Sequence, residues 1–283
     1  MKTKIITDAM SDITQGVAAT YDIEVIPIGV SLGGAYVMSD ELEVEKTFNW
    51  ISENKKIPEF KGISTNTFVE IFEKYIKQGM EIIYISSGSK SISNYDCACH
   101  ASTRFPNANI HIFDSHQVSG VTAMMALYAA AMAQDDESAN AIAIRFERSM
   151  EKFKHHGLAS TVDFLKYAGL CPRIVAVGVN LLNAKFEFAM KEDKKFDVQM
   201  VGTSMKRAMT NYISNIFKDL KGIDPKRIFL MRTISDGQED NFTDLYRKVE
   251  DLDYFEEIVV CEAGHYATSL VGKNGVSVAY QLK

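Results

Sequence analysis

The sequence predicts an α/β protein in which a doubly wound parallel-sheet domain is followed by a second, α+β domain. Along the first half of the chain, apolar runs, polar loops and amphipathic runs repeat in that order, as in doubly wound folds. After about residue 155, two strand-like runs flank a short charged turn, which is typical of a β-hairpin. We therefore expect domains at residues 1–154 and 155–283, with a ligand site in the cleft between them.

Composition and charge narrow the class of protein. Lys and Arg total 31 against 37 for Asp and Glu, so the formal net charge is −6. The chain therefore lacks the excess of positive charge with which proteins bind the phosphates of nucleic acids. No run approaches the roughly 20 apolar residues of a membrane span, and no apolar signal segment follows the charged start, so we expect a cytoplasmic protein. Four cysteines lack zinc-site spacing and are predicted to be reduced structural thiols: Cys97, Cys99, Cys171 and Cys261.

Strands and helices alternate in the prediction through residue 153. Apolar β-branched runs indicate strands, and apolar residues at i, i+3 and i+4 indicate helices. Pro27 lacks a backbone N–H, so its strand is expected at a sheet edge or with a bend. In chain order the predicted elements are strand 4–7, helix 13–20, strand 23–30, helix 44–53, helix 68–76, strand 82–85, a helix after residue 93, strand 109–113, helix 120–134 and helix 137–153.

The most informative stretch is the buried strand at residues 82–85 and the loop that follows it. This loop is rich in serine and leads to Ser93 and Asn94 at the start of a helix. Hydroxyl groups beside the free N–H groups of a helix N-terminus suit an anionic ligand. The alternative interpretation is that these side chains only cap the helix and fill a turn.

Two further groups of hydroxyls lie at predicted strand ends or helix starts. Ser64 and Thr65 precede the helix at 68–76, where capping and ligand contact are again the alternatives. Ser115 follows Asp114 at the end of strand 109–113. Because ligands of doubly wound sheets bind at the carboxyl ends of the strands, we include these residues among the candidate ligand contacts.

The pattern of predicted strands and helices changes in the second half of the chain. The helix at 137–153 is expected to end at His155-His156-Gly157, and Gly169 to Pro172 break the chain. The predicted elements that follow are strand 158–162, a short helix 163–167, hairpin strands 184–190 and 196–200, helix 205–217, strand 227–232, helix 241–252 and closing strands 256–261 and 276–281.

Several motifs, in a shared order, resemble the DegV family of bacterial fatty-acid-binding proteins. Thr7-Asp8-Ala9-Met10-Ser11-Asp12-Ile13 is similar to the family's Thr-Asp-Ser-x-x-Asp-Leu opening, with Ala9 in place of serine. Ile23 to Ile28 resembles its Ile-x-Val-Val-Pro-Leu strand. Asp114-Ser115 with Val118-Ser119-Gly120 resembles its Asp-Ser-x-x-Val-Ser-x-Gly element, and the stretch 164–185 resembles the region around its Gly-Gly-Arg-Ile turn.

The resemblance implies a binding and carrier protein rather than an enzyme. In that family a long-chain fatty acid lies between the domains, and hydroxyls of two loops hold its carboxylate. The resemblance assigns Ser64 and Thr65 to the first loop, and Ser93 with Asn94 to the second. It also implies a fatty acid kinase as a partner, and no cofactor beyond the bound fatty acid.

Two positions depart from the family pattern. By register, Leu170 stands where the family has the arginine of Gly-Gly-Arg, and Leu270 stands where it has the histidine of His-x-Gly-Pro-Gly. Arg173 and His265 are the nearby residues that would compensate. The substitutions place the kinase-coupled role in question.

The rival hypothesis is a hydrolytic or phosphoryl-transfer enzyme. It would use acids and a serine at strand ends, namely Asp8, Asp12, Ser93 and Asp114. The chain has no Gly-x-x-x-x-Gly-Lys-Ser/Thr loop, no Gly-x-Ser-x-Gly elbow and no His-Glu-x-x-His motif. We therefore favour the lipid carrier.

Overall fold

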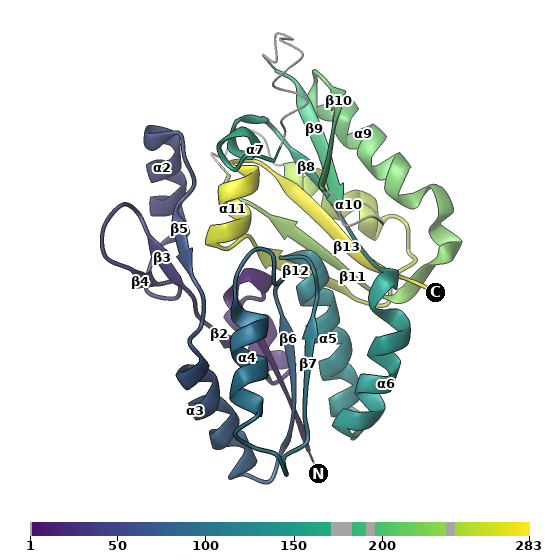
Figure 1. Ribbon diagram of the computed structural model, residues 1–283. Coiled ribbons are helices and arrows are strands. Elements are labelled where there is room, and N and C mark those ends of the chain that lie inside the picture. Colours follow the sequence, from purple (N-terminus) through teal and green to yellow (C-terminus); the bar gives the residue numbers. More distant parts are fainter. Residues whose placement is uncertain (1, 171–182, 191–195, 236–240) are drawn as a thin grey trace. The chain divides into compact units, whose positions relative to one another are not determined.

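The computed structural model describes residues 2–170, 183–190, 196–235 and 241–283, and the chain forms two compact units (Figure 1). Unit 1 comprises residues 1–31, 35–41 and 60–153, and unit 2 comprises residues 32–34, 42–59 and 154–283. Residues 42–59, which the sequence prediction placed in the first domain, thus belong to unit 2. The reason is packing, because helix α2 (Val44–Asn54) contacts helix α11 (His265–Val271).

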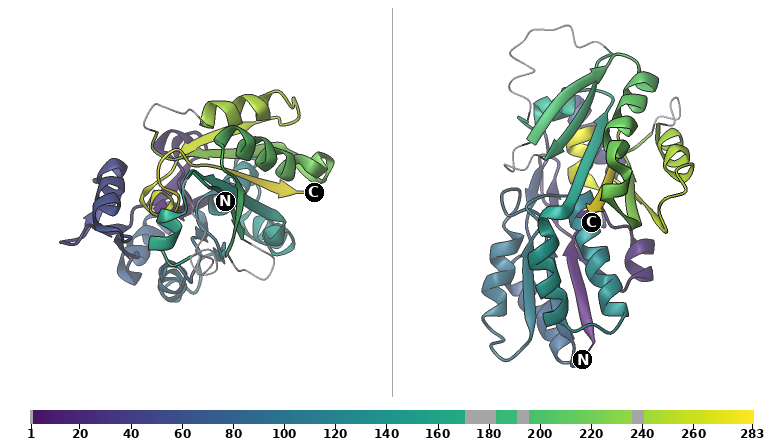
Figure 2. Two further views of the ribbon diagram at one scale, coloured as in Figure 1. Left: turned by 90° about the horizontal axis from the view of Figure 1, so that it is seen from above. Right: turned by 90° about the vertical axis from the view of Figure 1, so that its right-hand side faces the viewer.

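Unit 1 is built on a parallel four-stranded sheet with the order β2-β1-β6-β7. Helices α3 and α4 lie together on one face and α5 and α6 on the other (Figures 1 and 2), as predicted for a doubly wound domain. The elements are β1 (Thr3–Asp8), η1 (Ala9–Ser11), α1 (Gln15–Thr20), β2 (Ile23–Ile26), α3 (Thr65–Ile76), β6 (Glu81–Ser86), α4 (Asn94–Ser102), β7 (Ile110–Asp114), α5 (Gly120–Gln134), α6 (Ala139–Ser149) and η2 (Met150–Lys152).

The order of these strands sets the place of a ligand site. The chain leaves β1 toward β2 on one side and later returns to β6 on the other side of β1. Every residue of β1 and β6 is buried, because helices cover both faces of a parallel sheet. The carboxyl ends of β1 and β6 therefore form the switch point at which such sheets present ligand sites.

Pro27 divides the single strand predicted at 23–30 into two. Strand β2 forms an edge of the parallel sheet and ends at Ile26, while β3 (Gly29–Ser31) joins a separate three-stranded sheet with the order β4-β3-β5. The other strands of this small sheet are β4 (Val37–Met38) and β5 (Glu59–Lys61). The expectation of an edge or a bend at Pro27 is confirmed.

Unit 2 contains a six-stranded mixed sheet with the order β10-β9-β8-β13-β11-β12. Strands β9 and β10 pair antiparallel, which confirms the predicted hairpin, and β11 and β12 pair parallel. In addition to α2 and α11, the elements of unit 2 are β8 (Phe153–Ala159), α7 (Asp163–Tyr167), β9 (Lys185–Met190), β10 (Phe196–Gly202), α9 (Met205–Ile216), η3 (Phe217–Gly222), β11 (Ile223–Arg232), α10 (Asn241–Glu250), β12 (Ile258–Glu262) and β13 (Val276–Leu282).

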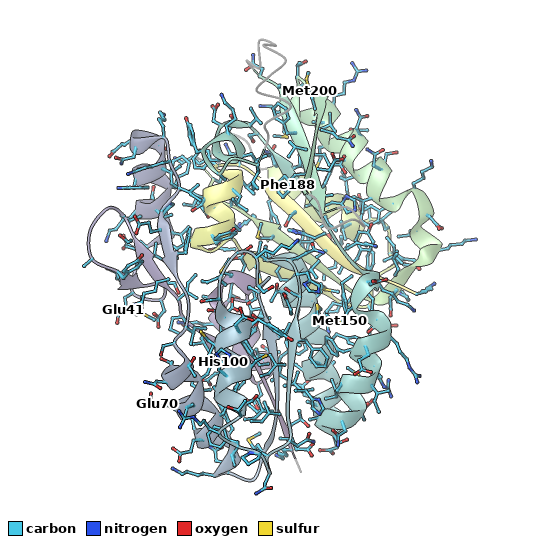
Figure 3. The ribbon with its side chains drawn as sticks, in the orientation of Figure 1. Glu41, Glu70, His100, Met150, Phe188 and Met200 are labelled. Atoms are coloured by element: carbon cyan, nitrogen blue, oxygen red, sulfur yellow. The ribbon has the colours of Figure 1, made fainter. Side chains whose placement is uncertain are left out.

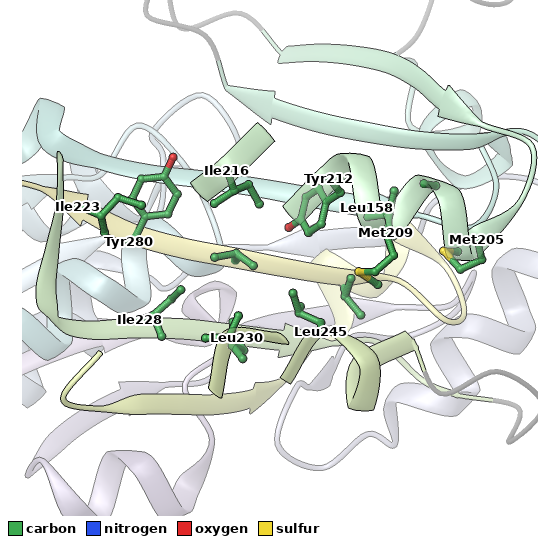
Figure 4. Close-up of a cluster of buried hydrophobic side chains, with 14 residues drawn as sticks. Leu158, Met205, Met209, Tyr212, Ile216, Ile223, Ile228, Leu230, Leu245 and Tyr280 are labelled. Carbon is green, nitrogen blue, oxygen red and sulfur yellow. The ribbon is translucent and has the colours of Figure 1, made fainter. Parts of the chain in front are cut away.

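The sheet of unit 2 has a hydrophobic core against α9 and α10. Figure 4 shows Tyr212 and Ile216 of α9 and Leu245 of α10 packed on Leu230 and Tyr280 of the strands. A smaller apolar cluster forms around α7, α11 and β9, and it includes Leu165, Phe186 and Leu270.

The predicted helix end at His155-His156-Gly157 is wrong, because these residues lie inside strand β8. Gly157 pairs with Phe188 of the neighbouring strand β9, and a Cβ atom built on Gly157 would lie 1.9 Å from that phenyl ring. Phe188 is labelled in Figure 3. The glycine therefore leaves room for a cross-strand aromatic side chain. The sequence pattern shows a helix-ending glycine but cannot show this partner.

Candidate functional site

The site is built at the carboxyl ends of β1 and β6, where the Asp8 carboxylate accepts four hydrogen bonds. Its Oδ1 accepts from the Ser87 hydroxyl at 2.6 Å and from the Met10 N–H at 3.1 Å. Its Oδ2 accepts from the Ser87 N–H at 3.0 Å and from the Tyr84 hydroxyl at 2.9 Å. Asp8 has no exposed surface, so its carboxylate is used to hold the loop that follows β6.

Tyr84 is the fixed neutral donor in this arrangement. Burial raises the pKa of the Tyr84 hydroxyl well above its usual range, and the Asp8 carboxylate adds to the rise. The phenol therefore keeps its proton and donates a hydrogen bond to Asp8. Tyr84 is not among the site residues predicted from the sequence, although a tyrosine in an otherwise aliphatic strand is the signal that would have found it.

A second carboxylate, Asp114 at the end of β7, holds the same loop from the other side. Its Oδ1 accepts from the Ser89 N–H at 3.2 Å and from the His116 N–H at 2.7 Å. Its Oδ2 lies 3.0 Å from Nδ1 of the His116 ring. The two carboxylates thus hold the segment between β6 and α4.

The two hydroxyl loops predicted from the sequence lie against each other. The Asn94 side chain is fully buried, and its Oδ1 accepts a hydrogen bond from the Ile63 N–H at 2.8 Å. A Cβ atom on Gly62 would lie 2.7 Å from Asn94 Oδ1 and 3.3 Å from Ser93 Oγ, so only glycine allows this close approach. The loop before α3 and the start of α4 therefore lie together in unit 1 and form one candidate site.

The hydroxyls at this site differ in how far they are already used. Ser64 caps α3: its Oγ accepts from the Thr67 N–H at 3.1 Å and lies 2.8 Å from Thr67 Oγ1. Within the part of the chain that the structure describes, Thr65 and Ser93 have no hydrogen-bond partner for their hydroxyls, and Ser93 is exposed at the start of α4 without capping it. Thr65 and Ser93 are therefore the hydroxyls available to a ligand.

The amide nitrogen of Asn94 is a further donor at this site. Nδ2 is buried and, among the described residues, makes no hydrogen bond of good geometry. The amide nevertheless lies near enough to the Tyr84 hydroxyl to oppose the rise of the Tyr84 pKa slightly. A buried donor left unpaired is costly, so an acceptor on a ligand would stabilise this side chain.

Ser115 is occupied elsewhere. It is buried, and its hydroxyl lies 2.8 Å from the Gln117 carbonyl oxygen and 2.9 Å from the Thr122 hydroxyl. The Gln117 N–H also donates to Ser115 Oγ at 3.3 Å. The side chain therefore closes the turn between β7 and α5, and a contact with a ligand would require breaking these bonds.

The remaining predicted site residues lie in unit 2. His265 is buried at the start of α11, and its Nδ1 lies 2.8 Å from the Thr47 hydroxyl of α2. Leu270 and the partly buried Leu170 belong to the same apolar cluster. Arg173 lies outside the described residues. The histidine thus joins two helices of unit 2, and the two leucines pack in an apolar cluster.

A cavity of about 420 Å³ also lies in unit 2, beyond the carboxyl ends of β11 and β12. Arg232, Phe242 and Glu262 are among its lining residues, and Arg232 forms an ion pair with Glu262 at 2.6 Å. None of the predicted site residues within the described ranges lines it. Across those ranges we find no group of three metal-ligating side chains and no helix long and apolar enough to cross a membrane.

Comparison with known proteins matches nearly the whole chain to one family. A family model described as uncharacterised protein, DegV family, matches residues 2–283. A DegV domain-containing protein from Listeria monocytogenes serovar 1/2a is 29% identical over 229 residues, which is 80% of this chain and 80% of that protein.

Two solved structures have a similar fold. The structure of a DegV family protein from Thermus thermophilus, whose name refers to fatty acid binding, has a TM-score of 0.83 at 24% identity. The match covers 100% of both chains. The fatty acid kinase (Fak) B3 protein from Streptococcus pneumoniae, loaded with linoleic acid, has a TM-score of 0.81 at 16% identity and covers 100% of both chains.

Proposed function

The chain belongs to the DegV family, and from this premise we propose that it binds a long-chain fatty acid and carries it. The observation that carries the proposal is the pair of available hydroxyls, Thr65 and Ser93, on two loops that the Asn94–Ile63 hydrogen bond holds together. Two hydroxyl donors and the buried Asn94 amide match the acceptor oxygens of a carboxyl head group. The fatty acid binding named for the Thermus thermophilus protein and the linoleic acid in the Streptococcus pneumoniae protein support the same ligand class.

Neutral donors are sufficient for the head group because the acyl chain supplies most of the binding free energy. Burial of apolar groups contributes about 0.8 kcal/mol per CH₂, so a chain of roughly 16 carbons brings on the order of 10 kcal/mol before the entropic costs of binding. The hydroxyl loops then determine where the head group lies.

We further propose that the carried fatty acid is presented to a fatty acid kinase; the Streptococcus pneumoniae neighbour, which is named a fatty acid kinase (Fak) B3 protein and is loaded with linoleic acid, supports this. Leu170 and Leu270 occupy an apolar cluster and offer no charge to a phosphoryl group. Transfer of phosphate to the carboxylate is therefore expected to be inefficient in this chain.

The enzyme hypothesis has less support. A general acid or base must reach the proton that it transfers, whereas Asp8 is fully buried and accepts four hydrogen bonds from its own loops, and Asp114 accepts two and pairs with His116. A turnover screen with esters and phosphate esters tests this alternative directly. Sustained product formation that is lost in Ser93→Ala would restore it.

The carrier proposal is tested by the contents of the purified protein. Native mass spectrometry followed by lipid extraction is expected to find a monocarboxylic lipid close to one per chain. Delipidated protein should also show a higher melting temperature when fatty acid is added, because a ligand that binds only the folded state stabilises it. Absence of both the lipid and the shift would reject the proposal.

A further inference from the structure

The loop between β6 and α4 is held at two points by carboxylates from two different strands. Asp8 of β1 accepts from the Ser87 N–H and hydroxyl at 3.0 and 2.6 Å. Asp114 of β7 accepts from the Ser89 N–H at 3.2 Å. The two attachment points are separated only by Gly88, so this part of the loop has little freedom to move.

Gly88 adds a third link between the loops. Its N–H donates to the Gln117 carbonyl oxygen at 2.6 Å, and a Cβ atom on Gly88 would lie 2.9 Å from the carbonyl carbon of His116. The Gly88 carbonyl oxygen in turn accepts from the Ser91 and Ile92 N–H groups at 2.8 and 3.3 Å. The chain therefore runs through a closed turn from the carboxylate attachments directly to Ser93.

We propose that Asp114 is a positioning residue for the ligand head group, acting through the Ser89 N–H to fix the loop that presents Ser93; this proposal rests on the proposed function. A carboxylate suits this role because its two oxygens serve three donors of two loops, the Ser89 N–H, the His116 N–H and His116 Nδ1. Asp114 is 9% exposed, so these bonds are largely shielded from water.

The sign of the effect on affinity separates positioning from simple electrostatics. A negative charge near a carboxylate ligand opposes binding, so removing Asp114 would strengthen binding if charge alone mattered. If Asp114 positions the loop, its removal weakens binding, because the head-group donors lose their fixed geometry. The two mechanisms therefore predict changes in opposite directions.

The test compares Asp114→Ala with a matched control, Asp96→Ala. Asp96 is exposed in the first turn of α4, close to the same loop, and makes no hydrogen bond to that loop among the described residues. Fatty acid affinity is expected to fall about tenfold in Asp114→Ala and to stay equal or rise slightly in Asp96→Ala. Asp114→Asn should restore part of the affinity, because its amide oxygen still accepts from the Ser89 N–H.

Hydrogen exchange of the ligand-free protein gives an independent measurement. The Ser89 amide should exchange about tenfold faster in Asp114→Ala than in the parent, with no change in Asp96→Ala. If Asp114→Ala does not fold, Asp114→Asn keeps the test decisive: it removes the negative charge and weakens the hydrogen bonds to two loops, so affinity below the parental value supports positioning and affinity at or above it contradicts positioning. Parental or higher affinity in Asp114→Ala would overturn the inference, whatever the exchange rate at Ser89.

Failure of the proposed function has a different signature. If neither the parent nor Asp96→Ala binds any fatty acid, the carrier proposal fails, whatever Asp114 does. If the parent binds and Asp114→Ala binds equally well or better, only the positioning role fails.

Discussion

Asn94 of α4 and Ile63 of the loop before α3 are joined by a hydrogen bond of 2.8 Å from the Ile63 N–H to Asn94 Oδ1. The two residues are 31 positions apart, and both are buried. This bond brings the two hydroxyl loops of the candidate site together. It also explains why Gly62, next to Ile63, has no room for a side chain.

Asn94→Ala should weaken both the fold and the site. The substitution leaves the Ile63 N–H buried without an acceptor, which costs about 1–3 kcal/mol in the free energy of unfolding. Fatty acid affinity should fall as well, because the loops are no longer joined. Urea unfolding and a fatty acid titration measure the two effects. Asn66→Ala, at an exposed position in the first turn of α3, is the control and should leave both unchanged.

Ser93→Ala should weaken binding without weakening the fold. The Ser93 hydroxyl is exposed and does not cap α4, so its removal breaks no bond of the folded protein among the described residues. Loss of one hydrogen bond to a charged carboxylate costs about 1.5–3 kcal/mol, or roughly 10- to 150-fold in Kd. Ser91→Ala removes an exposed hydroxyl from the same loop and serves as the control. Equal affinity in the parent and in Ser93→Ala would remove Ser93 from the site.

His155 should make unit 2 sensitive to acid. Burial lowers the pKa of the His155 ring from 6.5 to about 3, and the neighbouring His156 adds to the effect. The residue as a whole is only partly covered, but its Nε2 atom is buried without a partner among the described residues, so the ring nitrogen itself is desolvated. A depressed folded-state pKa gives stability that is present above pH 6.5 and is lost as the pH falls toward 3.

Urea unfolding of the parent and of His155→Phe across this pH range measures the effect. Phenylalanine keeps an aromatic ring against Phe188, which the His155 ring meets edge-on at 6.4 Å. The parent should lose more stability than the variant between pH 6.5 and 3. Its free energy of unfolding should fall more steeply with decreasing pH, by a slope that corresponds to the uptake of up to about one extra proton on unfolding. Identical pH profiles in the two proteins would contradict the assignment of acid sensitivity to His155.

Leu170 and Leu270 should limit phosphoryl transfer to the carried fatty acid. The family resemblance puts an arginine and a histidine at these positions, and cationic groups stabilise the charge that develops when a carboxylate is phosphorylated. The double substitution Leu170→Arg, Leu270→His should therefore raise the rate of acyl phosphate formation by a fatty acid kinase with ATP. Because Leu270 is buried in an apolar cluster, the melting temperature of the double variant is measured in parallel. A rate in the parent equal to that of the stable double variant would defeat this prediction.

The sequence alone determined the fold class and the positions of the hydroxyl loops. Periodicity is a local property, so alternating strands and helices, the hairpin at 184–200 and the helix starts at Ser64 and Ser93 could be predicted from neighbouring residues. The sequence prediction failed at His155-His156-Gly157, which it made the end of a helix. The contact that favours a strand there is with Phe188, about 30 residues away along the chain and on the adjacent strand.

Only the tertiary structure decided which side chains of the site remain available. From the sequence, five residues of unit 1 are equal candidates for ligand contact: Ser64, Thr65, Ser93, Asn94 and Ser115. The structure separates them by their hydrogen bonds: Ser64 caps a helix, Ser115 closes a turn, Asn94 joins two loops, and the hydroxyls of Thr65 and Ser93 have no partner among the described residues. Each of these outcomes depends on the distance and direction of a partner in space, and a linear pattern of residue types does not contain that information.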